Sequence, residues 1–255
     1  MPSLIASAVD HVFDDAGLFP PASRPMAEAL RAHHAATTGP WAGLVGPFLC
    51  PVSRLDELDA CVASGLPRPA AIGLIAYDAV RMGRKPNAVR GLVQFEAPLG
   101  IRLPELGSRV VRYLEVPATA KVHDALDQVA ELGARAKVRC GGRTRDDVPT
   151  PDRVADVLVG CVERGLQLKA TAGLHEPFTT TGPGGRKYGF VNMLAAAACA
   201  RTGGYRAQVA EVLTTEEPEA VDLVHRLTRA RELLRSMGTC SIDEPVDALV
   251  ARGLL

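Results

Sequence analysis

One lysine of this chain lies inside a short apolar segment, Leu166–His175, where an apolar residue would be expected. Polar and apolar residues alternate along this segment, which places Lys169 and Thr171 on one face of a predicted strand. A buried lysine is costly unless it is paired or used in chemistry. The plain alternative is an ammonium group that reaches water at the strand end. The residues on neighbouring strands decide between these two interpretations.

Charged residues recur near the carboxyl ends of three further predicted strands. They are Glu96, Glu115 and the pair Lys137 and Arg139. Strands of a parallel barrel are normally apolar on both faces, so surface exposure explains this recurrence poorly. Carboxylates beside lysines can transfer protons, and a lysine that has lost its proton attacks carbonyl carbons. We predict Lys169 as nucleophile or base, with Glu96 and Glu115 as acid/base partners. The alternative is an internal salt-bridge network that only replaces apolar filling.

A second set of residues is typical of an anion site. Lys137 and Arg139 are followed by Gly141 and Gly142, so cationic groups and bare backbone N–H groups are presented together. Thr171 adds a hydroxyl two residues after the lysine of its strand. We predict that these residues hold a phosphate or carboxylate group of a substrate. For the glycine pair, an ordinary strand-to-loop turn is the alternative.

Two residues beyond the lysine strand are further candidates. His175 follows the glycine turn and is predicted as a general acid/base at the rim of the site, although a loop histidine without a role is common. Asn192, near the start of the next predicted helix, could hydrogen-bond a ligand, and packing on the helix surface is the alternative.

No metal ligand is predicted, and no cofactor is expected. The acidic stretch Asp10–Asp15, which includes His11, could hold a divalent cation such as Mg²⁺ together with Glu96 and Glu115. It has no H-x-H pattern and no carboxylates at a fixed spacing, so this cation remains an alternative.

Strands alternating with helices must position these residues. Eight strands are predicted, at Leu4–Val9, Ala42–Leu49, Ala70–Ala76, Val89–Glu96, Arg109–Val116, Ala134–Arg139, Leu166–His175 and Gln208–Leu213. Helices are predicted at Arg24–Ala36, from Ser53 to Gly65, and at Val122–Leu132, Asp152–Glu163, Phe190–Ala200, Glu217–Met237 and Glu244–Ala251. This order predicts an α/β fold, a single (β/α)8 TIM-barrel-like domain over residues 1–255 with extra C-terminal helices from about residue 217. No G-x-G-x-x-G follows the first predicted strand, which disfavours a dinucleotide-binding sheet. The basic run Arg81–Lys85 is predicted as a solvated loop.

The segment Lys169-Ala-Thr-Ala-Gly173 resembles the lysine strand K-T-S-T-G of class I aldolases of the deoxyribose-phosphate aldolase type. The match covers about five residues and rests on Lys169, Thr171 and Gly173. The resemblance implies a (β/α)8 barrel in which Lys169 forms a Schiff base and a loop beyond it binds phosphate. That family carries a second lysine on the following strand in a K-x-x-G-G pattern, and Gln208–Leu213 offers none. Here the second lysine, Lys137, comes from the preceding strand.

Composition limits the partners and the compartment. Lys plus Arg and Asp plus Glu number 29 each, so bulk charge favours neither a nucleic-acid nor an anionic-membrane partner. The six cysteines are widely spread without a C-x-x-C, as expected of reduced thiols, and no apolar run reaches the length of a signal peptide or membrane helix. We therefore expect a cytoplasmic protein with a small anionic substrate, with a homo-oligomer as an option.

Taken together, the sequence predicts a lyase of the aldolase type acting on a small anionic carbonyl compound through a strand-end lysine. One alternative is a metal-assisted or lysine-base enolising enzyme, an isomerase or lyase. The other is a barrel without catalysis that binds a metabolite or a protein partner.

Overall fold

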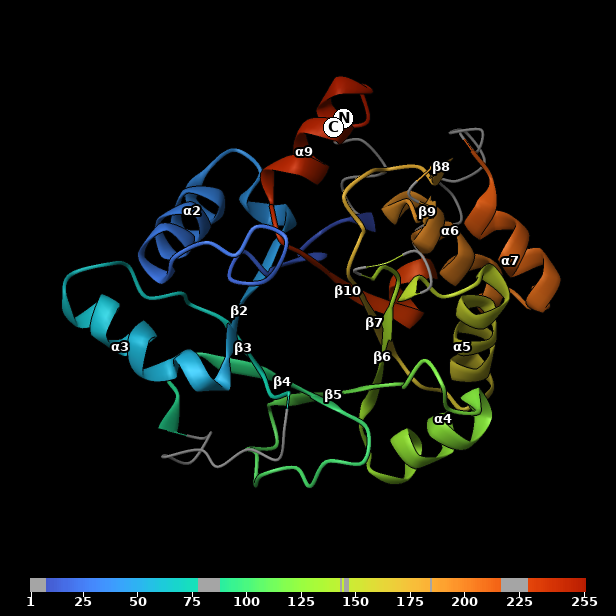
Figure 1. The fold of residues 1–255 in the computed structure, drawn as a ribbon, viewed down its shortest axis with the longest axis horizontal. Coiled ribbons are helices and arrows are strands. Elements are labelled where there is room, and N and C mark those ends of the chain that lie inside the picture. Colours follow the sequence, from blue (N-terminus) through green and yellow to red (C-terminus); the bar gives the residue numbers. More distant parts are fainter. Residues whose placement is uncertain (1–7, 78–87, 143, 145–146, 184, 217–228) are drawn as a thin grey trace.

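Eight parallel strands close into a barrel, which confirms the predicted fold class (Figure 1). The computed structural model describes residues 8–77, 88–142, 144, 147–183, 185–216 and 229–255. The barrel strands are β1 (Phe13–Asp15), β2 (Val45–Pro51), β3 (Ile72–Ile75), β4 (Leu92–Pro98), β5 (Val111–Glu115), β6 (Arg135–Arg139), β7 (Leu168–Thr171) and β10 (Leu234–Thr239). Around the barrel they follow the order β1-β10-β7-β6-β5-β4-β3-β2, so the last strand lies between the first and β7.

Helices surround this barrel. They are α2 (Met26–Thr38), α3 (Leu55–Ala63), α4 (Val122–Glu131), α5 (Pro151–Glu163), α6 (Phe190–Arg201), α7 (Arg206–Thr214) and α9 (Asp243–Ala251), with 3₁₀ turns at η1 (Ala42–Leu44) and η2 (Val52–Arg54). A small antiparallel hairpin, β8 (Thr180–Gly182) with β9 (Gly185–Lys187), lies in the connection between β7 and α6. The predicted basic loop Arg81–Lys85 lies outside the described residues.

The first strand was predicted in the wrong place. It is β1, Phe13–Asp15, which lies inside the acidic stretch Asp10–Asp15 that follows the predicted strand. Of the predicted strand Leu4–Val9, only Ala8 and Val9 are described, and neither is in a strand. An acidic strand can be buried here because each carboxylate finds a partner. Asp14 contacts Lys169 inside the barrel, and Asp15 contacts His33 of α2 at 3.0 Å.

The last strand was also predicted in the wrong place. Gln208–Leu213 forms part of helix α7, because its buried residues Val209 and Leu213 are four apart and lie on one helical face. The backbone N–H of Tyr205 donates to Gln208 Oε1 at 3.2 Å and caps this helix. The eighth barrel strand is β10, Leu234–Thr239, which overlaps the end of the segment predicted as the helix Glu217–Met237. Residues 217–228 of that segment lie outside the described residues.

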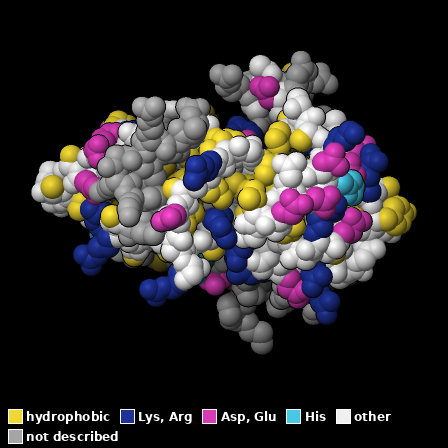
Figure 2. Space-filling view, turned by 90° about the horizontal axis from the view of Figure 1, so that it is seen from below, with side chains coloured by type: hydrophobic (Ala, Val, Ile, Leu, Met, Phe, Trp, Pro, Cys, Tyr) yellow, Lys and Arg dark blue, Asp and Glu magenta, His cyan; other side chains and the backbone are white. Residues whose placement is uncertain are grey.

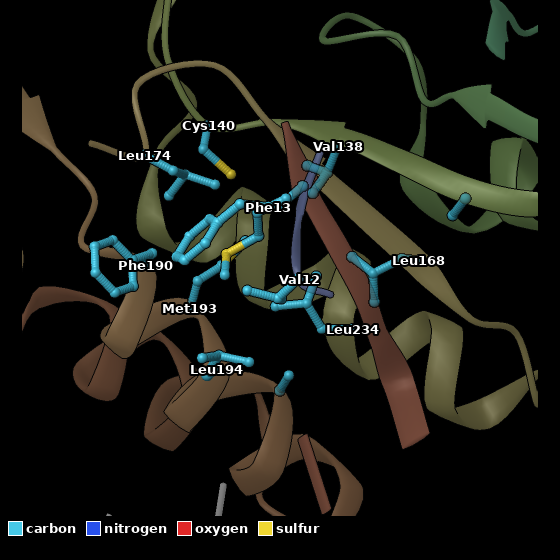
Figure 3. Packing of buried hydrophobic residues seen from close by; sticks show 14 of the residues in the cluster. Val12, Phe13, Val138, Cys140, Leu168, Leu174, Phe190, Met193, Leu194 and Leu234 are labelled. Atoms are coloured by element: carbon cyan, nitrogen blue, oxygen red, sulfur yellow. The ribbon is translucent and has the colours of Figure 1, made fainter. Parts of the chain in front are cut away.

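The core lies between the outer faces of the strands and the helices (Figure 3). Figure 3 shows Phe13 of β1 directed towards Phe190 of α6, with Met193 and Leu234 close by. The two phenyl rings meet edge to face, with centroids 5.3 Å apart. Helix α6 is buried on nearly all sides, as expected of a helix rich in alanine and other apolar residues.

The barrel is covered unevenly. The connection from β4 to β5, residues 99–110, contains no helix. Figure 2 views the molecule from the side on which these two strands lie in Figure 1, and hydrophobic side chains gather near the middle of that face between charged ones. None of the helices in the described part of the chain is long and apolar enough to cross a membrane.

Candidate active site

Alternation along the strands builds a charged centre inside the barrel. On β4, Phe95 and Ala97 belong to the outer core, while Glu96 points inward; on β6, Lys137 points inward between Ala136 and Val138. In the register of the barrel Lys137 pairs with Lys169 of β7 and with Glu115 of β5. The residues predicted on β4, β5, β6 and β7 therefore converge, as Glu96, Glu115, Lys137 and Lys169.

Lys169 lies at the middle of this centre and is fully buried. Its ammonium group donates to Asp14 Oδ2 and, at 2.5 Å, to Glu96 Oε1. The ring of Tyr113 lies near this ammonium group, with its centroid 5.8 Å from Nζ. Burial lowers the pKa of the amine, but the carboxylates of Asp14 and Glu96 outweigh it and raise that pKa above its ordinary value. Lys169 is therefore a fixed cation at neutral pH.

Glu96 connects the two lysines. Its Oε1 accepts from Lys169, and its Oε2 lies 2.8 Å from Lys137 Nζ. Burial raises the pKa of this carboxyl group, yet the ammonium groups of Lys137 and Lys169 lower it further and bring it to about 2. Glu96 is thus ionised at every physiological pH and holds two cations together.

Asp14 is a member of the centre that the sequence did not identify as one. Its Oδ2 accepts from Lys169, from Gln94 Nε2 at 2.9 Å and from Ser236 Oγ at 3.0 Å. Its Oδ1 is buried without a hydrogen-bond partner and faces Gly46, where a Cβ would lie only 2.4 Å away. Because β1 has only three residues, it is too short to show the two-residue alternation that indicates a strand, and Asp14 could not be placed on a barrel strand from the sequence.

The centre opens towards the carboxyl ends of the strands through Lys137 and Glu115. Lys137 Nζ lies 3.2 Å from Glu115 Oε2, and the Glu115 side chain is 26% exposed while that of Lys169 is 0% exposed. Tyr77, just after β3, is within electrostatic range of Arg139, Glu96 and Glu115. Lys137 and Glu115 therefore lie on the side of the cluster that faces the carboxyl ends of the strands, where TIM barrels place their active sites.

The predicted anion clamp is only partly assembled. Arg139 is exposed and pairs in register with Thr171, whose Oγ1 is buried without a hydrogen-bond partner. Gly141 packs on the turn after β7, where a Cβ would meet Ala172 at 3.2 Å. Gly142 packs more closely still, since a Cβ there would lie 2.0 Å from the Cβ of Asp147. Close packing accounts for both glycines, and their role in anion binding stays a prediction.

The other two predicted residues lie apart from the two lysines. Asn192 is buried on α6, where its Oδ1 accepts from Thr179 N at 2.9 Å and its Nδ2 donates to the carbonyls of Val212 and Thr215 at 2.8 Å each. Its amide is thus used to join three segments of the chain. His175 contacts Glu244 and Cys240 at the mouth of the barrel.

The described residues contain no group of three or more His, Cys, Asp or Glu side chains arranged to hold a metal ion. The ammonium of Lys169 lies between Asp14 and Glu96, where a cation would bind. Asp15 points to the other face of β1, towards His33. A divalent cation remains the alternative stated above.

The chain matches no protein-family model and no curated protein. Fold and geometry together define a TIM-barrel protein with a cluster of two lysines and three carboxylates in and above the barrel interior.

Proposed function

We propose that this protein is a lyase of the aldol type that cleaves or forms a C–C bond in a small carbonyl compound bearing a phosphate or carboxylate group. The observation that carries the proposal is the pair of lysines sharing one buried carboxylate, Glu96, beneath the carboxyl ends of the strands. A lysine that must form an imine needs such carboxylates, because protons have to move as water is lost.

The geometry favours Lys137 over Lys169 as the imine-forming residue, although the sequence favoured Lys169. Each lysine is paired with two carboxylates, so its amine must lose a proton before it can attack. Lys169 has no exposed surface, whereas Lys137 can pass its proton to the partly exposed Glu115. Lys137 contacts Glu115, which opens to solvent at the strand ends. We therefore assign Lys169 to electrostatic stabilisation and Lys137 to attack on the carbonyl carbon.

We assign the other residues of the site to steps of the reaction from their positions around Lys137. The neutral amine of Lys137 adds to the carbonyl carbon, and Glu115 transfers the protons with which the carbonyl oxygen leaves as water. The cationic imine nitrogen then accepts the electron pair released when the neighbouring C–C bond breaks. Arg139 and Thr171, side by side in register at the strand ends, are assigned to the anionic group of the substrate.

Borohydride reduction tests the proposal. The protein is incubated with a panel of small aldehydes and keto acids, with and without a phosphate group, then reduced and weighed intact by mass spectrometry. We expect one stable adduct per chain in the wild type and in the Lys121→Met control, which removes an exposed lysine outside the barrel. The Lys137→Met variant should form none. An unmodified wild-type protein with every carbonyl compound would contradict the proposal.

A specific observation favours one rival, a barrel that binds a metabolite without catalysis. Both lysines are paired with carboxylates, as in a network that only fills the barrel. That rival predicts saturable binding of a panel compound, seen by calorimetry, without an adduct. The metal-assisted alternative predicts no adduct, together with a bound divalent ion found by elemental analysis.

A further inference from the structure

Three side chains from different elements meet at the mouth of the barrel, away from the two lysines. Cys240 directly follows β10, His175 follows the turn after β7, and Glu244 lies in the first turn of α9. His175 Nδ1 lies 2.7 Å from Glu244 Oε2, and Cys240 Sγ lies 3.9 Å from His175 Nε2. Because β7 and β10 are adjacent strands, the barrel itself sets this arrangement.

The arrangement is that of a nucleophile, a base and a carboxylate that orients the base. Glu244 holds the imidazole through Nδ1, and the sulfur lies 3.9 Å from Nε2 and 4.0 Å from Nδ1, so the ring acts on the thiol through its charge. The contact with Cys240 raises the pKa of His175; burial opposes this, and Glu244 adds to it. An imidazolium ion beside a thiol favours the thiolate, which is the reactive form of cysteine.

The surroundings of the other cysteines differ. Burial raises the pKa of the Cys140 and Cys161 thiols to about 12, so both are unreactive near neutral pH. Cys61 and Cys199 are more exposed than Cys240, which is only 7% exposed. Cys240 is therefore less exposed than two of the other thiols, and a high reactivity of Cys240 would have to come from its neighbours His175 and Glu244.

We propose that Cys240 is a nucleophilic thiol, activated by His175 and Glu244, that takes small hydroperoxides as substrates. The low exposure of Cys240 admits only a small electrophile, and His175 supplies the proton that a peroxide leaving group needs. The thiolate attacks one peroxide oxygen; the S–O bond forms as the O–O bond breaks. Sulfur loses two electrons and becomes a sulfenic acid, and the peroxide gains these electrons. The leaving group, a hydroxide from hydrogen peroxide or an alkoxide from an organic hydroperoxide, takes the proton of His175 to become water or an alcohol.

Charged groups around the site set its pH dependence. Glu244 faces His175 from α9, and the turn at Gly17 packs on the Cys240 carbonyl, with Asp15 and Arg24 beside it. Asp15 is already paired with His33 on the far side of β1, so Glu244 and Cys240 act most directly on the imidazole. An ordinary thiol is only a few per cent thiolate at pH 7.

The test compares thiols within one molecule. The protein is treated with a limiting amount of iodoacetamide between pH 6 and pH 9, and the labelled cysteines are identified by peptide mass spectrometry. We expect Cys240 to be labelled ahead of the more exposed Cys61 and Cys199 at pH 6 to 7, because only a thiolate reacts and a neighbouring imidazolium favours the thiolate. Preferential labelling of Cys61 or Cys199 at pH 6.5 would overturn the proposal.

Variants and a peroxide complete the test. His175→Asn should slow Cys240 labelling at pH 7 about tenfold and lose this deficit by pH 9.5, and Glu244→Gln, a change on an exposed side chain, should slow it about threefold. Hydrogen peroxide followed by dimedone should tag Cys240, and Cys240→Ser should remove the tag. An unchanged labelling rate in Glu244→Gln and His175→Asn, or no dimedone tag in the wild type, counts against the proposal. Imine trapping is detected on lysine residues and thiol labelling on cysteine residues, so either proposal can fail without the other.

Discussion

Replacing Glu96 with Gln removes the carboxylate that joins the two lysines, and the structure sets the size of the effect. The pKa of Glu96 is about 2 in the folded chain against an ordinary 4.5, a difference worth about 3 kcal/mol of folding free energy. The side chain is fully buried, so solvent screening does not reduce this value. Because two buried ammonium groups lose a partner, we expect Glu96→Gln to destabilise the protein by about 3 to 5 kcal/mol at pH 7.

The effect depends on pH with a definite sign. The folded pKa is lower than the unfolded one, so the contribution of Glu96 is fully present above about pH 4.5 and is lost as the pH falls towards 2. The stability difference between wild type and Glu96→Gln, measured by urea unfolding followed by circular dichroism, should fall to less than half by pH 3. Glu57→Gln is the control, since it breaks an exposed ion pair with Arg54 and should cost less than about 1 kcal/mol. A loss below about 1 kcal/mol at pH 7 for Glu96→Gln, or a loss that does not change down to pH 3, would refute the reasoning.

Two further stability predictions test the surroundings of the centre. Gly46→Ala places a Cβ 2.4 Å from Asp14 Oδ1 and should cost about 1 to 3 kcal/mol in urea unfolding; an unchanged midpoint would show that Asp14 moves aside freely. Asn192→Ala leaves the N–H of Thr179 and the carbonyls of Val212 and Thr215 without their partner, and should cost about 2 kcal/mol or more. Wild-type stability in Asn192→Ala would mean that water replaces the amide.

The fold class could be predicted from the sequence because six barrel strands show either an apolar run, as Ile72–Ile75 does, or alternating apolar and charged residues, as Arg135–Arg139 does. The two strands that were misplaced, β1 and β10, lack this signal. β1 has three residues, two of which are carboxylates, and in β10 the polar residues Arg235 and Ser236 directly follow the first residue, Leu234. Both are barrel strands only because partners elsewhere in the chain satisfy their polar groups, as Lys169 does for Asp14. Such long-range pairing leaves no local pattern in the sequence.

The errors in the strands carried over to the site. Glu96, Glu115, Lys137 and Lys169 were predicted together because alternation on well-formed strands reveals which residues share a face. Asp14 was considered only as a possible cation ligand in the acidic stretch Asp10–Asp15, and its contact with Lys169 follows from the true position of β1. The charge state of Lys169 could not be predicted, since it depends on which carboxylates lie within hydrogen-bond distance.

Peptide mapping of the borohydride-reduced adduct tests the central claim most directly, because it identifies which lysine of the buried pair reacts with a carbonyl compound. The wild-type protein is reduced in the presence of the panel compound that gives the largest adduct, digested and sequenced by tandem mass spectrometry. We predict that the added mass lies on Lys137, with Lys169 unmodified and still held between Asp14 and Glu96. An adduct on Lys169, or on an exposed lysine such as Lys121, would contradict this account.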